Sequence, residues 1–495
     1  MADFDILIIG GGINGCGIAR DAAGRGLRVC LAEADDLGGA TSSASSKLIH
    51  GGVRYLEHYE FRLVREALKE REVLWQMAPH IIRPMRFVMP HHKAMRPAWL
   101  LRLGLFLYDH IGGRKLLPGT RSLDLRSDPV GHALKADFTK GFEYSDCWVE
   151  DSRLVILNAR DAADRGAEIH VRCPVEAVEW QGDHWRVLMR DLATGSQIER
   201  RARVVINAAG PWVDEVLSGA LGRNDSRNVR LVRGSHIVVP KLFDHDKAYI
   251  FQNPDQRIIF AIPYRDDFTL IGTTDAEHDR QVGTVTIAPE EVAYLAASAN
   301  RYFITQIDAG DVVWSYSGVR PLYDDGASKA QEATRDYVIH TEAERPLINI
   351  FGGKITTFRK LSEAVMAEAA ALLRIDDAPW TRGATLPGGD FPVTGFDDLV
   401  AAICRAYPFL DPDLARRYCR FYGTNVRDIL GQATSNADLG QNFGHGIYAA
   451  ELDHARGREW VREAEDFLFR RTRLGIDLPE EGRAAIAAYL QATPG

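Results

Sequence analysis

The chain has 495 residues, of which 46% are hydrophobic and 26% charged, and its formal net charge at pH 7 is -8. This length predicts two to four domains of about 150 residues each, and the acidic balance argues against a general nucleic-acid binder. The six cysteines are far apart with no CxxC pair, which favours reduced thiols in a cytoplasmic protein. The sequence has no apolar run of about 18 residues, so no transmembrane helix is predicted.

The N-terminal residues predict a βαβ unit that binds a dinucleotide. Residues 4–9 (FDILII) form a short apolar run typical of a buried parallel strand, residues 13–25 predict a helix, and residues 27–32 predict a second strand. Glu33 follows that strand, where a carboxylate can accept hydrogen bonds from a ribose. A glycine turn without a ligand is the alternative, and it is disfavoured because the strand, helix, strand and acid are all in register. The GxGxxG motif between the first strand and the helix consists of Gly10, Gly12 and Gly15.

The next stretch, TSSASSKLIHGGVRYLEHYEF (residues 41–61), concentrates hydroxyl groups just before a lysine, a histidine and an arginine. A solvated linker is the alternative interpretation. GxGxxG alone does not separate NAD from FAD, but a hydroxyl-rich return towards the pyrophosphate favours the longer FAD. Residues 202–212 and 348–357 are two further strands that end in small residues, and both are expected to return to the same cofactor.

A basic segment follows at residues 83–115, with seven bases and the single acid Asp109, hence a net charge of +6. Within it, residues 97–110 predict a helix on which leucines share one face. A basic patch with Trp99 and Phe106 suits an anionic membrane surface. A core helix with basic flanks is the alternative.

The remaining chain predicts two kinds of structure. Residues 230–274 alternate as strands and predict an antiparallel sheet that covers the cofactor. After a linker rich in glycine and proline, amphipathic helices are expected. These helices are expected at residues 397–407, 413–423, 457–475 and 480–490.

The sequence resembles the FAD-dependent glycerol-3-phosphate dehydrogenases, which belong to the D-amino-acid oxidase-like group of flavoproteins. The motifs that carry the resemblance are GGGINGCGIARDAAGRGL, TSSASSKLIHGGVRYLEHYEF, GFEYSDCWVED, NAAGPWV, RGSHIVVP, IGTTD, YSGVRPL and FGGKITTFRKL. They imply an α/β fold in which a Rossmann-like FAD-binding domain joins an antiparallel-sheet substrate domain and is followed by a C-terminal all-helical domain. The expected domains are residues 1–80 with 145–215 and 335–380 for FAD, 81–144 with 216–334 for substrate, and 381–495 for the helices. The helical domain is expected to serve dimerisation or stability more than chemistry.

The resemblance implies oxidation of sn-glycerol 3-phosphate to dihydroxyacetone phosphate, with hydride transfer from C2 to FAD and electrons passed to a membrane quinone such as ubiquinone. It also implies a homodimer, peripheral on the inner face of the cytoplasmic membrane. The alternatives are an oxidase that returns the electrons to oxygen, an amine or amino-acid oxidase on the same fold, and a non-catalytic flavin-bound membrane module.

The resemblance also implies site residues. The expected catalytic and substrate-binding residues are His50, Arg54, His236, Arg320, Arg335 and Lys354. The expected cofactor-binding residues are Gly10, Gly12, Asn14, Gly15, Glu33, Thr41, Ser42, Ser46, Lys47, Leu48, Val175, Ala209, Gly210, Gly353, Lys354 and Thr356. No metal is expected, because the adjacent His91 and His92 do not face one site and no HExxH motif follows.

The base that removes the hydroxyl proton is left open by the sequence. His50 and His236 both lie in family motifs, and an ordinary histidine pKa of about 6.5 suits the task. His236 is slightly favoured as the group nearest the substrate, with His50 against the flavin. In a third possibility, Arg54 or Lys354 lowers the pKa of the alcohol while water removes the proton.

Overall fold

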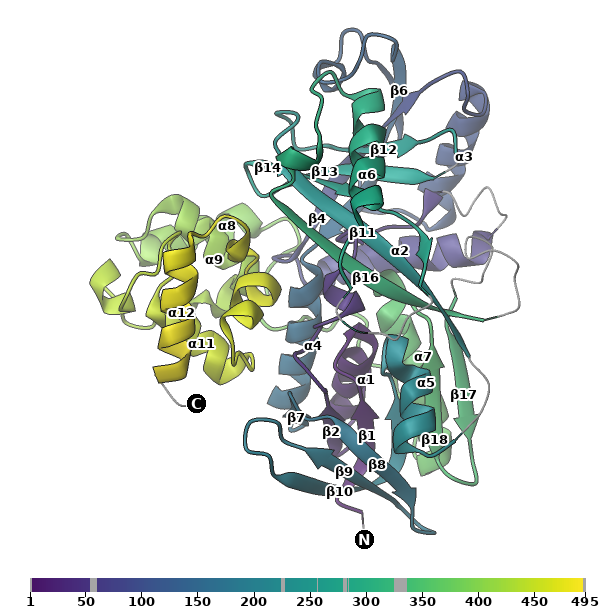
Figure 1. The fold of residues 1–495 in the computed structure, drawn as a ribbon, viewed down its shortest axis with the longest axis vertical. Helices are drawn as coiled ribbons and strands as arrows, with labels where there is room; N and C mark the ends of the chain where they lie inside the picture. Colours follow the sequence, from purple (N-terminus) through teal and green to yellow (C-terminus); the bar gives the residue numbers. More distant parts are fainter. Residues whose placement is uncertain are drawn as a thin grey trace.

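A computed structural model of the chain describes residues 2–53, 60–223, 228–255, 257–278, 283, 285–324 and 336–492. Figure 1 shows two sheets, one above the other in the view, with a group of helices from the C-terminal part of the chain beside them. The protein is therefore an α/β fold with an added helical domain.

The lower sheet has eight strands in the order β17-β18-β10-β1-β2-β7, with β8 and β9 added through β10. Its strands are β1 (Phe4–Ile9), β2 (Val29–Ala32), β7 (Glu168–His170), β8 (Val175–Trp180), β9 (Trp185–Arg190), β10 (Gln197–Asn207), β17 (Val338–Glu342) and β18 (Leu347–Phe351). The central strands β18, β10, β1, β2 and β7 run parallel. This confirms the predicted βαβ start, and it brings the carboxyl ends of β1, β10 and β18 to one edge of the sheet.

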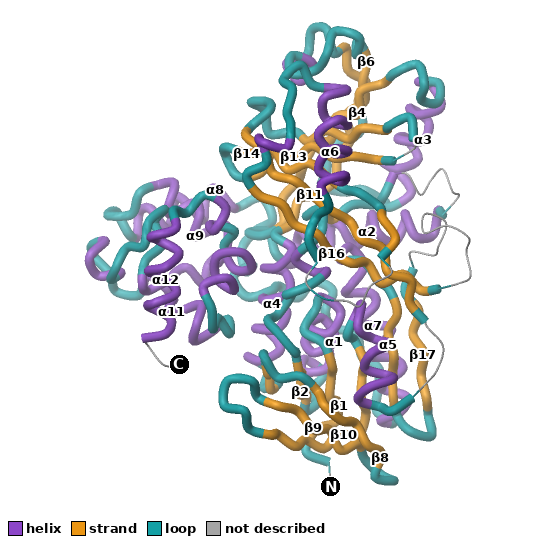
Figure 2. The backbone as a smooth tube through the Cα atoms, viewed as in Figure 1, coloured by secondary structure: helices purple, strands orange, loops and turns teal. Residues whose placement is uncertain are grey.

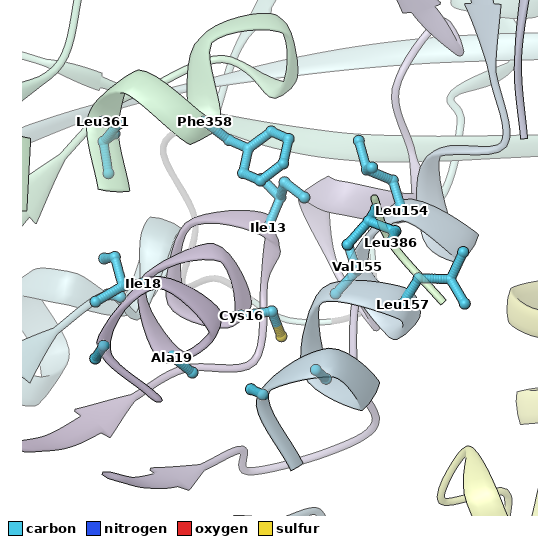
Figure 3. Close-up of a cluster of buried hydrophobic side chains, with 14 of the residues drawn as sticks. Ile13, Cys16, Ile18, Ala19, Leu154, Val155, Leu157, Phe358, Leu361 and Leu386 are labelled. Carbon is cyan, nitrogen blue, oxygen red and sulfur yellow. The ribbon is translucent and has the colours of Figure 1, made fainter. Parts of the chain in front are cut away.

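Helices cover this sheet and bury its apolar side chains. Helix α1 (Ile13–Gly24) packs against α4 (Asp151–Asp164) and α7 (Phe358–Leu373). Figure 3 shows Ile13 beside Phe358 on one side of α1, and Cys16 directed towards α4. Cys16 is fully buried, and burial raises the pKa of its thiol far above the usual range. The helix is rich in small residues because it must approach both neighbours closely.

The upper sheet has ten strands, with the main order β15-β11-β14-β13-β12-β4-β6-β3. Its strands are β3 (Leu48–Ile49), β4 (Ile82–His91), β5 (Arg121–Asp124), β6 (Lys140–Val149), β11 (Val229–Pro240), β12 (Ala248–Gln252), β13 (Ile258–Tyr264), β14 (Phe268–Gly272), β15 (Ala276–Glu277) and β16 (Trp314–Tyr323). Most neighbours are antiparallel, as predicted, but β12 pairs in parallel with β4. The sheet is therefore mixed, because β4 and β6 enter it from a distant part of the sequence.

Further helices complete this half of the molecule. They are α2 (Phe61–Met77), α3 (Ala98–Ile111) and α6 (Pro289–Tyr302), whereas α5 (Val213–Glu215) packs against β18 of the lower sheet. Helix α3 agrees with the helix predicted for residues 97–110. Among the described residues, no helix combines the length and the apolar character needed to cross a bilayer.

Figure 2 shows the C-terminal domain as helices joined by loops. Its helices are α8 (Phe396–Ala406), α9 (Pro412–Tyr422), α10 (Val426–Leu430), α11 (Ala449–Arg458) and α12 (Glu480–Ala492). The expectation of one helix over residues 457–475 is wrong, because α11 ends at Arg458 and a separate π-helical segment, η10, spans Asp466–Arg471. The carboxylate of Asp466 accepts hydrogen bonds from the backbone amides of Arg462 and Glu463, at 2.9 and 3.0 Å. The Asp466 carboxylate therefore caps the start of a new segment, and these residues do not extend α11.

A buried ion pair joins the C-terminal domain to helix α4, which covers the lower sheet. Arg153 on α4 donates from Nη2 to Glu459 Oε1 at 2.8 Å, and the two side chains are only 1% and 4% exposed. The guanidinium also lies over the ring of Tyr422, 4.9 Å from its centre. Since a buried charge without its partner is costly, this pair links the folding of the two domains.

We therefore expect Arg153→Met to lower the free energy of unfolding by about 3 kcal/mol, because it leaves the Glu459 carboxylate buried without its cation. The double variant Arg153→Met/Glu459→Met should recover much of that loss. Denaturant midpoints measured by circular dichroism check both. Arg28→Met is the matched control, because Arg28 pairs with Asp5 at an exposed site; an equal effect there would contradict the assignment.

Candidate active site

One large cavity, with a volume of about 1550 Å³, is lined by residues from both sheets and from the C-terminal domain. This volume exceeds the roughly 300–1,000 Å³ of common ligand pockets. The predicted residues that line it are Gly10, Gly12, Asn14, Glu33, Thr41, Ser42, Ser46, Leu48, His50, Val175, Ala209, Gly210, Arg320, Gly353, Lys354 and Thr356. The cavity thus unites the motif at the start of the chain with segments more than three hundred residues away.

At one end, the glycine-rich turn lies too close to its neighbours for side chains. Gly10 has a φ of +109°, and a Cβ there would lie 2.6 Å from the carbonyl oxygen of Ala208. A Cβ on Gly15 would lie 1.9 Å from the carbonyl oxygen of Gly10. Gly15 therefore does not line the cavity but permits the tight turn, which agrees with its expected role in the motif.

Polar groups at this end are arranged around the start of α1. Ser42 Oγ accepts from the backbone amide of Ile13 at 3.0 Å, and Glu33 Oε2 accepts from the amide of Gly11 at 2.6 Å. Asn14 donates to the carbonyl oxygen of Gly352 at 3.2 Å, while its own buried Oδ1 has no hydrogen-bond partner among the described residues. A buried amide oxygen without a partner, beside a glycine-rich turn that begins a helix and lines a cavity, fits a large polar ligand such as a dinucleotide.

The loop of residues 41–47 forms the adjoining wall, and a buried lysine anchors it. Lys47 is fully buried, and its Nζ lies 2.9 Å from Asp151 Oδ2 and 3.1 Å from the carbonyl oxygen of Ser43. Burial, followed by the nearby charge of Arg473, lowers the pKa of Lys47 to about 8. The structure places Lys47 behind the wall, where it anchors the loop whose serines line the cavity.

Three of the predicted catalytic groups, His50, Arg320 and Lys354, also line the cavity. The ring of His50 lies edge-on to Phe260, with ring centroids 6.3 Å apart. Arg320 donates from Nη1 to Asp275 Oδ1 at 2.7 Å and from Nη2 to the hydroxyl of Thr273. The cavity lining therefore includes a histidine, a lysine and an oriented guanidinium.

His236 contacts a lining residue but does not itself line the cavity. Its side chain is buried, and its Nε2 lies 2.9 Å from the hydroxyl oxygen of Ser46, which does line it. The ring stacks on Tyr316, with centroids 4.7 Å apart. Burial, followed by the charges of Arg320 and Lys47, holds its pKa well below the usual histidine value. The imidazole is therefore neutral near pH 7.

Arg54 and Arg335, two further predicted substrate-binding residues, lie outside the described residues.

Two sets of residues at the site were not anticipated from the sequence. Tyr108 on α3 accepts from the amide of Gly51 at 2.8 Å and donates to Asp146, which also pairs with Arg71 at 2.6 Å. This buried network fixes the backbone directly after His50. Its only sequence signal was the presence of Asp146 in the motif GFEYSDCWVED.

The second unanticipated set comes from the C-terminal domain. Phe469, Arg470 and Arg473 all line the cavity. Amphipathic periodicity predicted a helix here and gave no indication that its arginines face a ligand site.

Family comparisons agree with this geometry. The family described as FAD dependent oxidoreductase matches residues 5–359, and the family described as C-terminal domain of alpha-glycerophosphate oxidase matches residues 379–493. The chain belongs to the FAD-dependent oxidoreductases, and FAD is the cofactor that fits the cavity described above.

Individual relatives are similar over nearly their whole length. The D-erythritol 1-phosphate dehydrogenase of Brucella abortus (strain 2308) is 50% identical, over 98% of this chain and 97% of its own. The aerobic glycerol-3-phosphate dehydrogenase of Escherichia coli (strain K12) is 48% identical, over 99% and 98%. Among solved structures, the glycerol-3-phosphate dehydrogenase from Bacillus halodurans complexed with FAD has a TM-score of 0.78 at 27% identity, covering 99% of this chain and 94% of that one.

We expect Gly10→Ala to abolish FAD retention, because the new methyl group would overlap the backbone of Ala208 at the turn. The matched control is Gly26→Ala. Gly26 has a φ of +80°, and a Cβ there meets nothing within 4 Å, so only a backbone cost of about 1–2 kcal/mol is expected. The ratio of FAD to protein after gel filtration checks both variants. Loss of FAD from both would show that backbone strain, and not the close approach, is responsible.

Proposed function

We propose that this protein oxidises sn-glycerol 3-phosphate at C2 and yields dihydroxyacetone phosphate. The observation that carries the proposal is an oriented arginine, Arg320, in the same cavity as His50, Lys354 and the dinucleotide turn. Two relatives about half identical to the chain are named as dehydrogenases of polyol phosphates, which supports a phosphorylated alcohol as substrate. FAD, when bound, supplies the acceptor for the two electrons that leave the substrate carbon.

Arg320 is proposed to bind the substrate phosphate. Asp275 and Thr273 hold its guanidinium from one side, and its side chain is 30% exposed in the cavity wall. A planar, preoriented guanidinium suits bidentate recognition of phosphate oxygens. Arg335 is proposed as the second phosphate ligand, while Arg54 and Lys354 are proposed to lie near the reacting carbon.

His50 is proposed as the group that takes the hydroxyl proton. It lines the cavity, whereas the side chain of His236 is 1% exposed and reaches Ser46. This reverses the slight preference for His236 drawn from the sequence. His236 is instead proposed to orient the Ser46 hydroxyl towards the cofactor.

D-erythritol 1-phosphate is the second candidate substrate, because the relative from Brucella abortus named for it is as similar to this chain as the glycerol-3-phosphate dehydrogenases are. Both compounds are short polyols that carry one phosphate, so the same arginine can bind either. The two substrates differ in the length of the polyol chain, because erythritol has one more carbon than glycerol.

Anaerobic mixing of the yellow protein with each substrate tests this function. Loss of the visible absorption of the oxidised cofactor with sn-glycerol 3-phosphate, reversed by a ubiquinone analogue and only slowly by air, would support a quinone-linked dehydrogenase. Faster bleaching with D-erythritol 1-phosphate would support the second candidate, and rapid reversal by air would support an oxidase. Bleaching by amino acids alone would reject a phosphorylated substrate.

We expect Arg320→Lys to raise KM for the phosphorylated substrate by about tenfold or more, because lysine lacks the fork that Asp275 and Thr273 orient. The FAD content of the purified variant should equal that of the wild type. Steady-state kinetics with glycerol as a phosphate-free comparison check this. Equal losses with both compounds would place Arg320 outside phosphate binding.

The proposed partner surface is an anionic membrane, and α3 supports it. Four large apolar side chains on this helix are exposed: Trp99 by 69%, Leu103 by 48%, Phe106 by 48% and Leu107 by 42%. The opposite face is buried through Leu105, Tyr108 and Asp109. An exposed apolar helix face with basic flanks is typical of peripheral membrane binding.

Not every base in this segment belongs to that surface. Arg86 pairs with Glu143, and Arg83 lies over the ring of Trp148, 5.3 Å from its centre. Lys93 and Arg96 are exposed beside α3. The proposed membrane contact is therefore narrower than the whole basic segment. Electron transfer to a quinone, a location on the inner face of the cytoplasmic membrane and a homodimer remain predictions.

We expect the double variant Leu103→Glu/Phe106→Glu to reduce binding to vesicles that contain anionic phospholipid, because two charges would enter the apolar face. Leu192→Glu is the matched control, since Leu192 is 54% exposed in a turn of the other sheet. Vesicle co-sedimentation measures both. Unchanged binding in the double variant would reject α3 as the membrane contact.

A further inference from the structure

A short segment of the C-terminal domain, residues 470–473, contacts both loops that form the cofactor wall. The segment spans the end of η10 and the turn after it. Arg470 and Arg473 line the cavity, while Arg471 is fully buried behind it. These contacts involve neither of the proposed substrates, so a role for this segment rests on FAD binding alone.

Arg473 shares its partners with Lys47. Its Nη2 donates to Asp151 Oδ1 at 2.7 Å and to the carbonyl oxygen of Ser43 at 3.0 Å. Lys47 Nζ contacts the same carboxylate, at 2.9 Å, and the same carbonyl oxygen, at 3.1 Å. Asp151 also accepts from the hydroxyl of Ser45 at 2.7 Å. The fully buried carboxylate of Asp151 therefore contacts both the loop of residues 41–47, through Ser45 and Lys47, and the C-terminal domain, through Arg473.

The loop that follows β2 is also held by a buried carboxylate that pairs with arginines of the C-terminal domain. Arg471 donates from Nη2 to Asp36 Oδ1 at 2.9 Å, and both side chains are fully buried. Arg470 also pairs with Asp36. Asp36 lies three residues after Glu33, in the loop that continues from β2 along the cavity. The two cofactor loops thus depend on arginines that belong to a different domain.

We propose that the C-terminal domain is part of the FAD site, with Arg473 as the positioning residue for the loop of residues 41–47. Arg473 acts through Asp151 and Ser43, so it orders the serines that line the cavity. Docking of this domain and binding of FAD are therefore thermodynamically coupled, and each favours the other.

The position of Arg473 also has an electrostatic consequence. Its partners include the carboxylate of Asp151, and Glu150 directly precedes Asp151 in the chain. Without Arg473, the carboxylate of Asp151 would keep its contact with Lys47 but lose one positive charge. The wall would then become more negative, which disfavours the additional negative charge of a reduced cofactor. Arg473 is expected to raise the midpoint potential of the bound FAD.

The test compares Arg473→Gln, which removes the charge, with Arg473→Lys, which keeps it. Apoprotein is titrated with FAD to obtain Kd, and the midpoint potential is measured on the reconstituted protein. We expect Arg473→Gln to weaken FAD binding by about tenfold or more, as for loss of hydrogen bonds to a charged group, and to lower the potential. Arg473→Lys should keep the potential close to that of the wild type.

Arg417→Gln is the matched control, because Arg417 pairs with Glu451 inside the C-terminal domain, at 2.7 Å, and does not line the cavity. Its FAD affinity and potential should equal those of the wild type. If Arg417→Gln reproduces the changes, general destabilisation explains them and the proposal is overturned. Unchanged affinity and potential in Arg473→Gln would overturn it as well.

If Arg473→Gln does not fold, the coupling between domain docking and FAD binding can be tested on the wild-type protein. Limited proteolysis of the linker between α7 and α8, residues 374–395, reports undocking of the C-terminal domain. Coupling predicts that removal of FAD speeds cleavage there several-fold, while cleavage at the exposed turn around Leu192 keeps its rate. Equal linker cleavage with and without FAD would refute the coupling.

Discussion

The buried carboxylate of Asp151 is the interaction on which the site depends. It is fully buried at the start of α4, where it receives Lys47 from the loop of residues 41–47 and Arg473 from the C-terminal domain. Removing three charges from water is costly unless each finds its partner in good geometry. The loop, the helix and the distant domain therefore reach their native positions together, and the wall of the cavity forms as a consequence.

This constraint explains why the cavity can be both large and well defined. The parallel sheet contributes the glycine-rich turn to the cavity lining, and the mixed sheet contributes Arg320. Neither sheet makes a site by itself. Because the two sheets meet along one cavity, the cofactor turn and Arg320, the proposed phosphate ligand, line the same space.

Histidines in the site illustrate how position decides chemistry. His50 and His236 both belong to motifs of the family, and both carry the same side chain. His236 is buried among Tyr316, Ser46 and nearby cations, which keeps its imidazole neutral and away from the cavity. His50 follows β3 and lies on the cavity wall, and the network of Tyr108 and Asp146 fixes the backbone beside it. Burial, and not residue type, is therefore what distinguishes the role proposed for His236 from the role proposed for His50.

The sequence by itself determined the local elements and the identity of the cofactor turn. Residues 4–33 form the predicted strand, helix and strand, because apolar runs and closely spaced glycines act over a few residues and leave few alternative conformations. Most of the predicted cofactor residues line the cavity for the same reason: they sit in loops that directly follow such strands.

The tertiary structure alone decided how these pieces join. The pairing of β12 with β4 and the approach of Arg473 to Ser43 both depend on contacts between distant residues. The break after Arg458 is local, because the Asp466 carboxylate accepts from the amides of Arg462 and Glu463, a contact that amphipathic periodicity does not report. Ser43 and Arg473 are 430 residues apart, and Lys47 and Asp151 are 104 apart. Periodicity and motif spacing report which face of an element is apolar, but they do not report which buried charge will meet which partner. That outcome is set by the burial of charge, which becomes defined only when the domains pack.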